Sequence, residues 1–143
     1  MQQFSHVLRE YRKWMVSLPL VNMLLPYALY ICFGSIAVDF IVKLTYTIFP
    51  RIFGSGIFTV FNFLDSLAYF GFWIGFWLLL AAKEMKWAPY ALFATVFVLI
   101  FPFTSFSLFI VLKAALFIWL GYLLLKFTAS SSYSEVNERE ITL

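Results

Sequence analysis

Long apolar runs that carry almost no charge constrain the fold of this chain more than any other feature. Residues 18–38 contain no charged side chain, residues 57–82 contain only Asp65, and residues 87–125 contain only Lys113. About 20 apolar residues in a helix cross the hydrocarbon core of a bilayer, which is roughly 30 Å thick. The whole chain is 64% hydrophobic and 12% charged, which leaves too little polar surface for a soluble domain. The pattern predicts an all-α integral membrane protein.

We expect one bundle of four transmembrane helices within residues 18–127. A single helix over residues 87–125 would be roughly 58 Å long at 1.5 Å per residue, so this run must be divided. Pro102 disfavours a helical conformation at the residue before it, and Thr104 or Ser105 can cap a new helix. The predicted third helix is therefore short for a full crossing. The four expected spans are residues 18–38, 57–82, 88–101 and 106–126.

The segments that flank the spans have distinct compositions. Residues 1–17 carry apolar side chains at helical spacing opposite basic ones, which predicts an amphipathic helix in the headgroup region; a frayed polar leader is the alternative. Asp39 and Lys43 stand four residues apart and predict an ion pair on an interfacial helix after the first span. Residues 128–143 are serine-rich and acidic, which is typical of a flexible tail.

Basic residues are distributed unequally between the two predicted sides of the membrane. If all four helices cross, one side carries both termini and most of the lysines and arginines, and the positive-inside rule predicts that this side is cytoplasmic. We expect a multi-pass protein of the cell membrane. If the third helix does not cross, the side assigned to the C-terminal segment is reversed. The basic residues of the predicted cytoplasmic side are Arg9, Arg12, Lys13, Lys83, Lys86, Lys126 and Arg139, and those of the other side are Lys43 and Arg51.

Asp65 is the main lead to a mechanism, because it stands among aromatic residues in "FNFLDSLAYFGFW", residues 61–73. Lys113 in the fourth span is predicted to lie within roughly one or two ångströms of the same depth. Charged side chains inside a bilayer usually face other helices and find a partner, so we expect an intramembrane pair. Three roles stay open: a pair that fixes helix register, a polar cavity for an ion, proton or ligand, and a protonated or intersubunit carboxyl group.

Gly71 and Gly75 form a GxxxG motif in the second span. Small residues at this spacing allow a second helix to approach closely. The sequence leaves open whether that helix belongs to the same chain, to another copy or to a different protein.

Nothing in the sequence indicates an enzyme, a cofactor or a metal site. His6 and Cys32 are the sole histidine and cysteine, too few to build a metal site or to activate a nucleophile. The ten basic residues are scattered between apolar runs, so no continuous basic face for nucleic acid is predicted.

Three classes of function fit these features. The leading hypothesis is a non-enzymatic accessory or assembly subunit that acts through helix contacts with a protein partner in the membrane. The second is a homo-oligomeric small channel or transporter that uses Asp65 and Lys113. The third is a membrane-shaping or lipid-interacting protein that uses the basic leader. All three place the chain in the lipid bilayer.

Overall fold

The computed structural model describes residues 2–49, 55–103 and 107–130, and these residues are 91% helical with no strand among them. The all-α prediction is therefore confirmed. Three helical stretches are long and apolar enough to cross a membrane, namely Pro19–Ile48, Thr59–Ala81 and Leu108–Thr128. The apolar stretch Met85–Ile100 is shorter.

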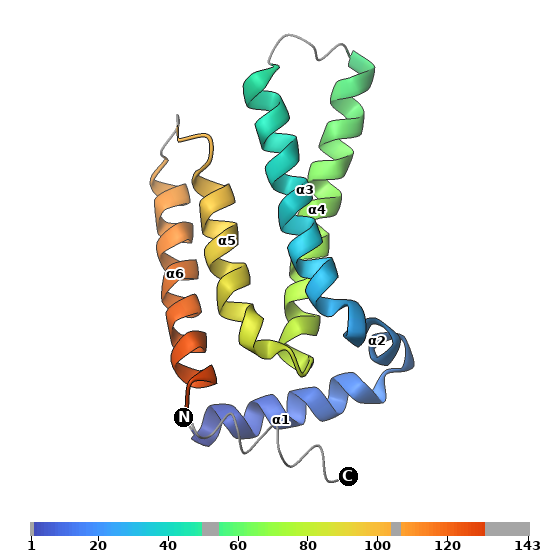
Figure 1. Ribbon diagram of the computed structural model, residues 1–143, viewed down its shortest axis with the longest axis vertical. Helices are drawn as coiled ribbons and strands as arrows, with labels where there is room; N and C mark the ends of the chain where they lie inside the picture. The colour runs from blue at the N-terminus through green and yellow to red at the C-terminus, as the bar shows by residue number, and fades with distance from the viewer. Residues whose placement is uncertain (1, 50–54, 104–106, 131–143) are drawn as a thin grey trace.

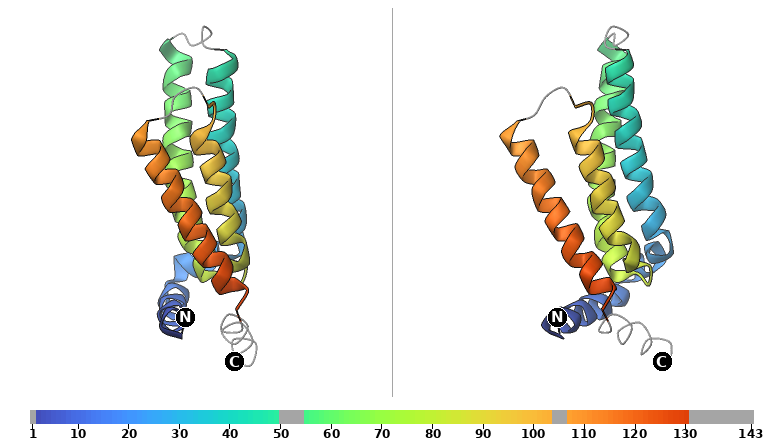
Figure 2. Two further views of the ribbon diagram at one scale, coloured as in Figure 1. Left: turned by 90° about the vertical axis from the view of Figure 1, so that its left-hand side faces the viewer. Right: turned by 60° about the vertical axis from the view of Figure 1, so that its left-hand side comes forward.

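Four long helices, α3 to α6, run along the long axis of the molecule, and α1 lies across one end of them (Figure 1). Helix α3 packs along α4 and α5 packs along α6, while α3 also contacts α5 and joins the two pairs (Figure 2). We call the end that holds α1 the basic end and the opposite end the far end. The elements are α1 (Gln2–Ser17), α2 (Pro19–Leu24), η1 (Leu25–Tyr27), α3 (Ala28–Ile48), α4 (Ser55–Ala81), η2 (Met85–Trp87), α5 (Ala88–Ile100) and α6 (Leu108–Thr128).

The first long helix differs from the prediction in where it breaks. The expected end at residue 38 does not form, and α3 continues through Asp39 and Lys43 to Ile48. These two charges bond to each other one turn apart, so they do not force the helix out of an apolar environment. A break does occur within the predicted span at η1, as the presence of Pro26 predicts, because this residue cannot donate a helical hydrogen bond. The predicted interfacial helix after residue 38 is therefore part of α3.

The other three helices begin and end within about two residues of the predicted bounds. The predicted break at residues 102–105 falls on a turn that includes Phe103, but Thr104 and Ser105 lie outside the described residues. Ser107 caps α6 instead, because its side-chain oxygen accepts a hydrogen bond from the Ile110 amide at 3.3 Å. Most of the predicted tail, residues 131–143, also lies outside the described part of the chain.

The glycine motif brings α3 and α4 close together. A Cβ atom added to Gly75 would lie 2.5 Å from the Cys32 backbone nitrogen, and one added to Gly71 would collide with the Ser35 hydroxyl. The strip therefore packs against α3 of the same chain. Below it, toward the basic end, buried side chains form a tightly packed layer that includes Ala28, Cys32, Leu79, Ala88, Ala91 and Leu92.

Candidate functional site

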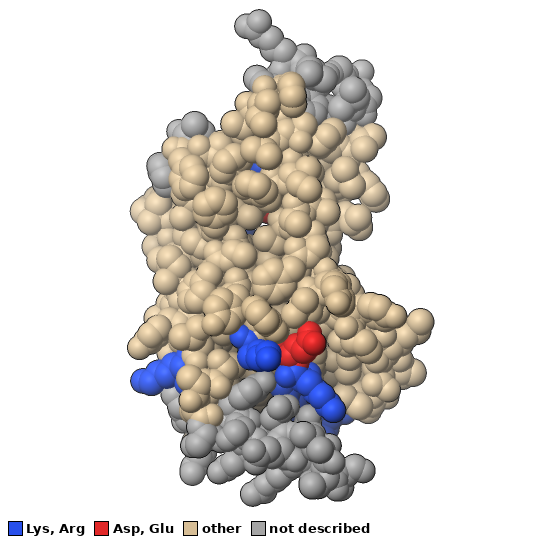
Figure 3. Space-filling view, viewed as in Figure 1, with Lys and Arg blue, Asp and Glu red and all other residues tan. Residues whose placement is uncertain are grey.

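Charged side chains from three helices meet in one cavity of about 140 Å³, which we call the charge cavity. It lies between the α3–α4 pair and the α5–α6 pair, and Figure 3 shows acidic and basic atoms inside a hollow at this place. The four charged residues of the cavity carry two positive and two negative formal charges. Its polar lining consists of Ser35, Asp39, Lys43, Asp65, Tyr69, Thr95 and Lys113.

Asp39 and Lys43 form a half-buried ion pair within α3, with 3.1 Å between the Lys43 Nζ and the Asp39 Oδ2. Lys43 also donates a hydrogen bond to the Val98 carbonyl of α5 at 3.3 Å. In a continuing helix this carbonyl would accept from the residue four positions later, which is Pro102 and has no N–H group. Lys43 therefore satisfies an acceptor that the proline leaves open, and it ties α3 to α5.

Asp39 of α3 and Asp65 of α4 line the charge cavity from the two sides of the α3–α4 interface, close enough for their charges to interact. Two like charges that lie near each other in a partly buried site disfavour the state in which both are ionised. Asp39 also accepts a hydrogen bond from Lys43. The cavity thus brings three ionisable groups together: Lys43, Asp39 and Asp65.

Lys113 lies near the rings of two aromatic residues rather than beside a carboxylate. Its Nζ is 5.7 Å from the Tyr69 ring centroid and 5.8 Å from that of Phe117, and the ring faces attract the cation. Asp65 lines the same cavity, so the structure brings the two predicted partners together. No ion pair joins them in the described part of the chain, and the Lys113 ammonium lies by the two rings instead.

The charge cavity is small and deep. Asp65 lies roughly 24 Å from the end of α4 at the basic end, at 1.5 Å per residue. The packed layer lies between the cavity and that end. The cavity's volume of about 140 Å³ holds several waters or a small ion, because one water molecule needs about 10–15 Å³. Drug-sized ligands require pockets of about 300 Å³ or more.

Sequence reasoning found Asp65 and Lys113 but placed Asp39 and Lys43 at the membrane interface. The structure puts all four into one cavity. One signal could have indicated this: an acid and a base at i,i+4 neutralise each other, so an apolar run can continue past them. Residues 40–42 between the two charges and residue 44 after them are apolar, which is compatible with a longer span.

Helix α1 is fixed to the basic end by a buried arginine. Arg12 is 2% exposed, and its guanidinium donates to the Ala82 carbonyl at 3.1 Å and to the Leu80 carbonyl at 3.5 Å. These carbonyls belong to the C-terminal end of α4, where acceptors lack helical partners and a cation is favoured. Tyr11 adds a hydrogen bond to the Trp77 carbonyl at 3.0 Å, and burial raises the pKa of the Tyr11 phenol above its ordinary value.

Known proteins give no guide to the role of the charge cavity. No protein-family model, curated protein or solved structure matches this chain. Within the described residues, no three histidine, cysteine, aspartate or glutamate side chains form a group that could hold a metal ion. The charge cavity and the basic end are the features of the described residues that bear most directly on function.

Proposed function

We propose that this protein is a small integral membrane transport protein that moves protons through the charge cavity. The observation that carries the proposal is that Asp39 and Asp65 line one small cavity beside the Lys43 ammonium. Two carboxyl groups in one such cavity favour binding of a single proton, because like charges near each other disfavour the doubly ionised state. Intramembrane acids in such arrangements commonly mark proton pathways.

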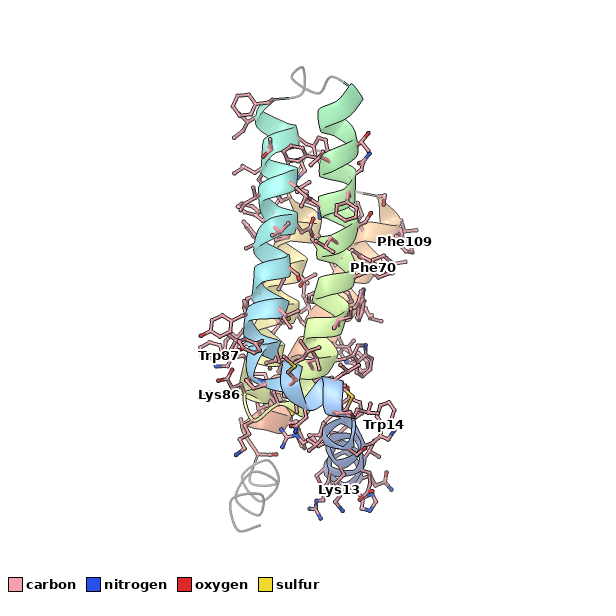
Figure 4. The ribbon with its side chains drawn as sticks, turned by 90° about the vertical axis from the view of Figure 1, so that its right-hand side faces the viewer. Lys13, Trp14, Phe70, Lys86, Trp87 and Phe109 are labelled. Atoms are coloured by element: carbon pink, nitrogen blue, oxygen red, sulfur yellow. The ribbon has the colours of Figure 1, made fainter. Side chains whose placement is uncertain are left out.

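In the proposed arrangement all four long helices cross the bilayer and both termini are cytoplasmic. Apart from Lys43 and Lys113 of the charge cavity, the basic side chains of the described residues gather at the basic end (Figure 3), which the positive-inside rule would place in the cytoplasm. Trp14 and Trp87 also lie toward this end (Figure 4), where tryptophan side chains are favoured at the headgroup level. The charge cavity then lies inside the hydrocarbon region, nearer the opposite surface.

The packed layer suggests how protons would be prevented from leaking. It consists of apolar side chains between the charge cavity and the basic end, so within the described residues it would separate a proton bound at Asp65 from the cytoplasmic side. A movement of the α5–α6 pair relative to the α3–α4 pair would open such a route. Lys43 joins the two pairs through the Val98 carbonyl, so it would couple this movement to the protonation of Asp39.

The accessory-subunit hypothesis has less support from the structure than from the sequence. It relied partly on Gly71 and Gly75 as a contact surface for another protein, but these residues pack against α3. The charge cavity, by contrast, contains more ionisable groups than the sequence alone indicated. The transport hypothesis therefore explains more of the structure.

The proposal is tested by proton flux into liposomes that contain the purified full-length chain and a pH-sensitive dye. Asp65→Asn keeps the shape of the side chain and its ability to hydrogen-bond, but it removes the proton-accepting carboxylate. We expect the flux to fall by about a hundredfold, to the level of vesicles without protein. Glu10→Gln makes the same charge change on the exposed side of α1, outside the charge cavity, and should leave the flux unchanged.

Three results would overturn this function. Wild-type vesicles could conduct protons no faster than empty ones, Asp65→Asn could conduct as well as the wild type, or Glu10→Gln could lose as much flux as Asp65→Asn. A size-exclusion profile and a thermal melt of each variant separate loss of transport from loss of folding.

A further inference from the structure

A second cavity lies at the basic end, between α1, the start of the first long helical stretch and the turn after α4. It has a volume of about 560 Å³, and we call it the basic cavity. Neither the charge cavity nor proton movement involves it. Its lining consists of Arg12, Lys13, Val16, Asn22, Leu25, Pro26, Ala81, Ala82, Lys83 and Glu84.

The charge of this lining favours an anion. Three basic side chains and one acidic side chain, Glu84, give a formal charge of +2. Arg12 is held in place by its bonds to the end of α4, so its position is fixed before any ligand binds. Lys13 and Lys83 are long and exposed at their ends, so they can adjust to a ligand, although Lys13 also pairs with Glu10 at 3.3 Å. Asn22 adds an amide donor.

The remaining lining is apolar and lies beside an exposed apolar surface. Val16, Leu25 and Pro26 face the basic cavity, and the adjoining α2 exposes Leu20 and Met23 at 76% and 74%. A ligand with one anionic group and long hydrocarbon chains matches this combination. Figure 4 places Lys13 and Trp14 on α1 at the same end of the molecule, as expected for a site at headgroup depth.

We propose that the basic cavity binds the phosphate group of an anionic phospholipid, whose acyl chains lie along α2 and the start of α3. Basic cavities between helices at the cytoplasmic surface are typical sites for such headgroups. The volume lies within the range of about 300–1,000 Å³ found for small-molecule sites. The inference is independent of proton transport and rests only on the placement of the basic end at the cytoplasmic surface.

The test measures how much phosphatidylglycerol stays bound to the full-length protein in native mass spectra after titration in mild detergent, with phosphatidylcholine as the neutral comparison. The variant Lys13→Gln with Lys83→Gln removes two charges from the lining. The matched control, Lys86→Gln with Lys126→Gln, removes two charges from the same end outside the basic cavity. We expect the first variant to lower the affinity for phosphatidylglycerol about tenfold or more, and the control to change it less than about twofold.

Competition with inorganic phosphate distinguishes a lipid from a free anion. Phosphate at millimolar concentration should leave the bound phosphatidylglycerol in place, because it lacks the acyl chains. Displacement by phosphate would overturn the lipid assignment in favour of a soluble anion site. An equal loss of affinity for phosphatidylglycerol in both double variants would show a general attraction of the lipid to the basic surface. Equal retention of phosphatidylglycerol and phosphatidylcholine by the wild type would show that the headgroup is not selected. Either result overturns the proposal. Proton flux in the same two variants tests the transport function separately.

Discussion

At the scale of single residues, the charged side chains in the apolar spans are explained by neighbours that are distant in the sequence. Asp65 stands among aromatic residues in its own helix, but it lines the same cavity as Asp39 of α3. Lys113 of α6 lies near the ring of Tyr69 of α4, and Lys43 of α3 bonds a carbonyl of α5. The two lysines are therefore stabilised across helix interfaces, and the position of all four charges depends on the way the helices pack.

Gly75 is the residue where this packing is most sensitive to side-chain size. In Gly75→Ala the new methyl group would lie 2.5 Å from the Cys32 backbone nitrogen, so α3 and α4 must separate. We expect the free energy of unfolding to fall by about 1–3 kcal/mol, as for other overpacked cores. The measurement is the temperature at which half of the protein leaves the monodisperse size-exclusion peak in detergent.

Gly34→Ala is the matched control in the neighbouring helix. No atom lies within 4 Å of a Cβ added there, and alanine favours a helix over glycine by up to about 1 kcal/mol. This variant should be as stable as the wild type or more stable. Equal destabilisation by both substitutions would mean that the close α3–α4 contact at Gly75 is not present.

At the scale of elements, the sequence predicted most of the helices and missed one boundary. The bounds of α4, α5 and α6 follow from apolar runs and from breakers such as Pro102, which act locally. The boundary at residue 38 was wrong because the Asp39–Lys43 pair was interpreted as an interface signal, whereas the pair is also compatible with a continuous helix. The similar depth of Asp65 and Lys113 in their two helices was enough to predict that they lie close together, and both line one cavity. The presence of Asp39 in the same cavity as Asp65 depends on tertiary packing, which periodicity does not encode.

Docking of α1 onto α4 should depend on pH through Tyr11. Its hydroxyl donates to the Trp77 carbonyl, and burial raises the pKa of this phenol above the ordinary value near 10. The folded state then holds the proton more tightly than the unfolded state. The stabilisation is fully present below pH 10 and is lost as pH rises through the folded-state pKa.

The comparison of thermal melts for the wild type and Tyr11→Phe isolates this effect. At pH 8 the wild type should be more stable by about 0.5–1 kcal/mol, the net value of one hydrogen bond, and the difference should shrink above pH 10. Tyr90→Phe, which changes an exposed tyrosine of α5, should follow the wild type at every pH. A constant difference between wild type and Tyr11→Phe from pH 8 to 11 would contradict a role for the phenol proton.

At the scale of the whole molecule, the two ends differ in a way that fits directional transport. The basic end carries α1, the basic cavity and the packed layer, whereas the charge cavity lies nearer the far end. The α5–α6 pair also ends below the α3–α4 pair at the far end (Figure 1). In a bilayer, this difference in height would shorten the path from the outer surface to Asp65.

The proposed topology requires the short helix α5 to reach the far surface. The apolar stretch Met85–Ile100 is roughly 24 Å long at 1.5 Å per residue, against about 30 Å of hydrocarbon, so the turn at Phe103 would lie near the outer boundary of the core. We expect Phe103→Cys to react with a membrane-impermeant maleimide from outside intact cells. Lys83→Cys should react only after the membrane is opened. Both substitutions are made in a Cys32→Ala background, which gives no signal alone because Cys32 is the sole cysteine.

The same labelling distinguishes the alternative in which α5 turns back inside the membrane. In that case Phe103→Cys and Lys83→Cys would both be protected in intact cells and would both react once the membrane is opened. Helix α6 would then begin on the cytoplasmic side and end outside, so Lys126 would leave the basic end. That result would contradict the structure, in which the end of α6 packs against α1 through the ring contact of Phe4 and Phe127, with 4.7 Å between ring centroids. The labelling pattern therefore tests the membrane topology and the docking of α1 in one experiment.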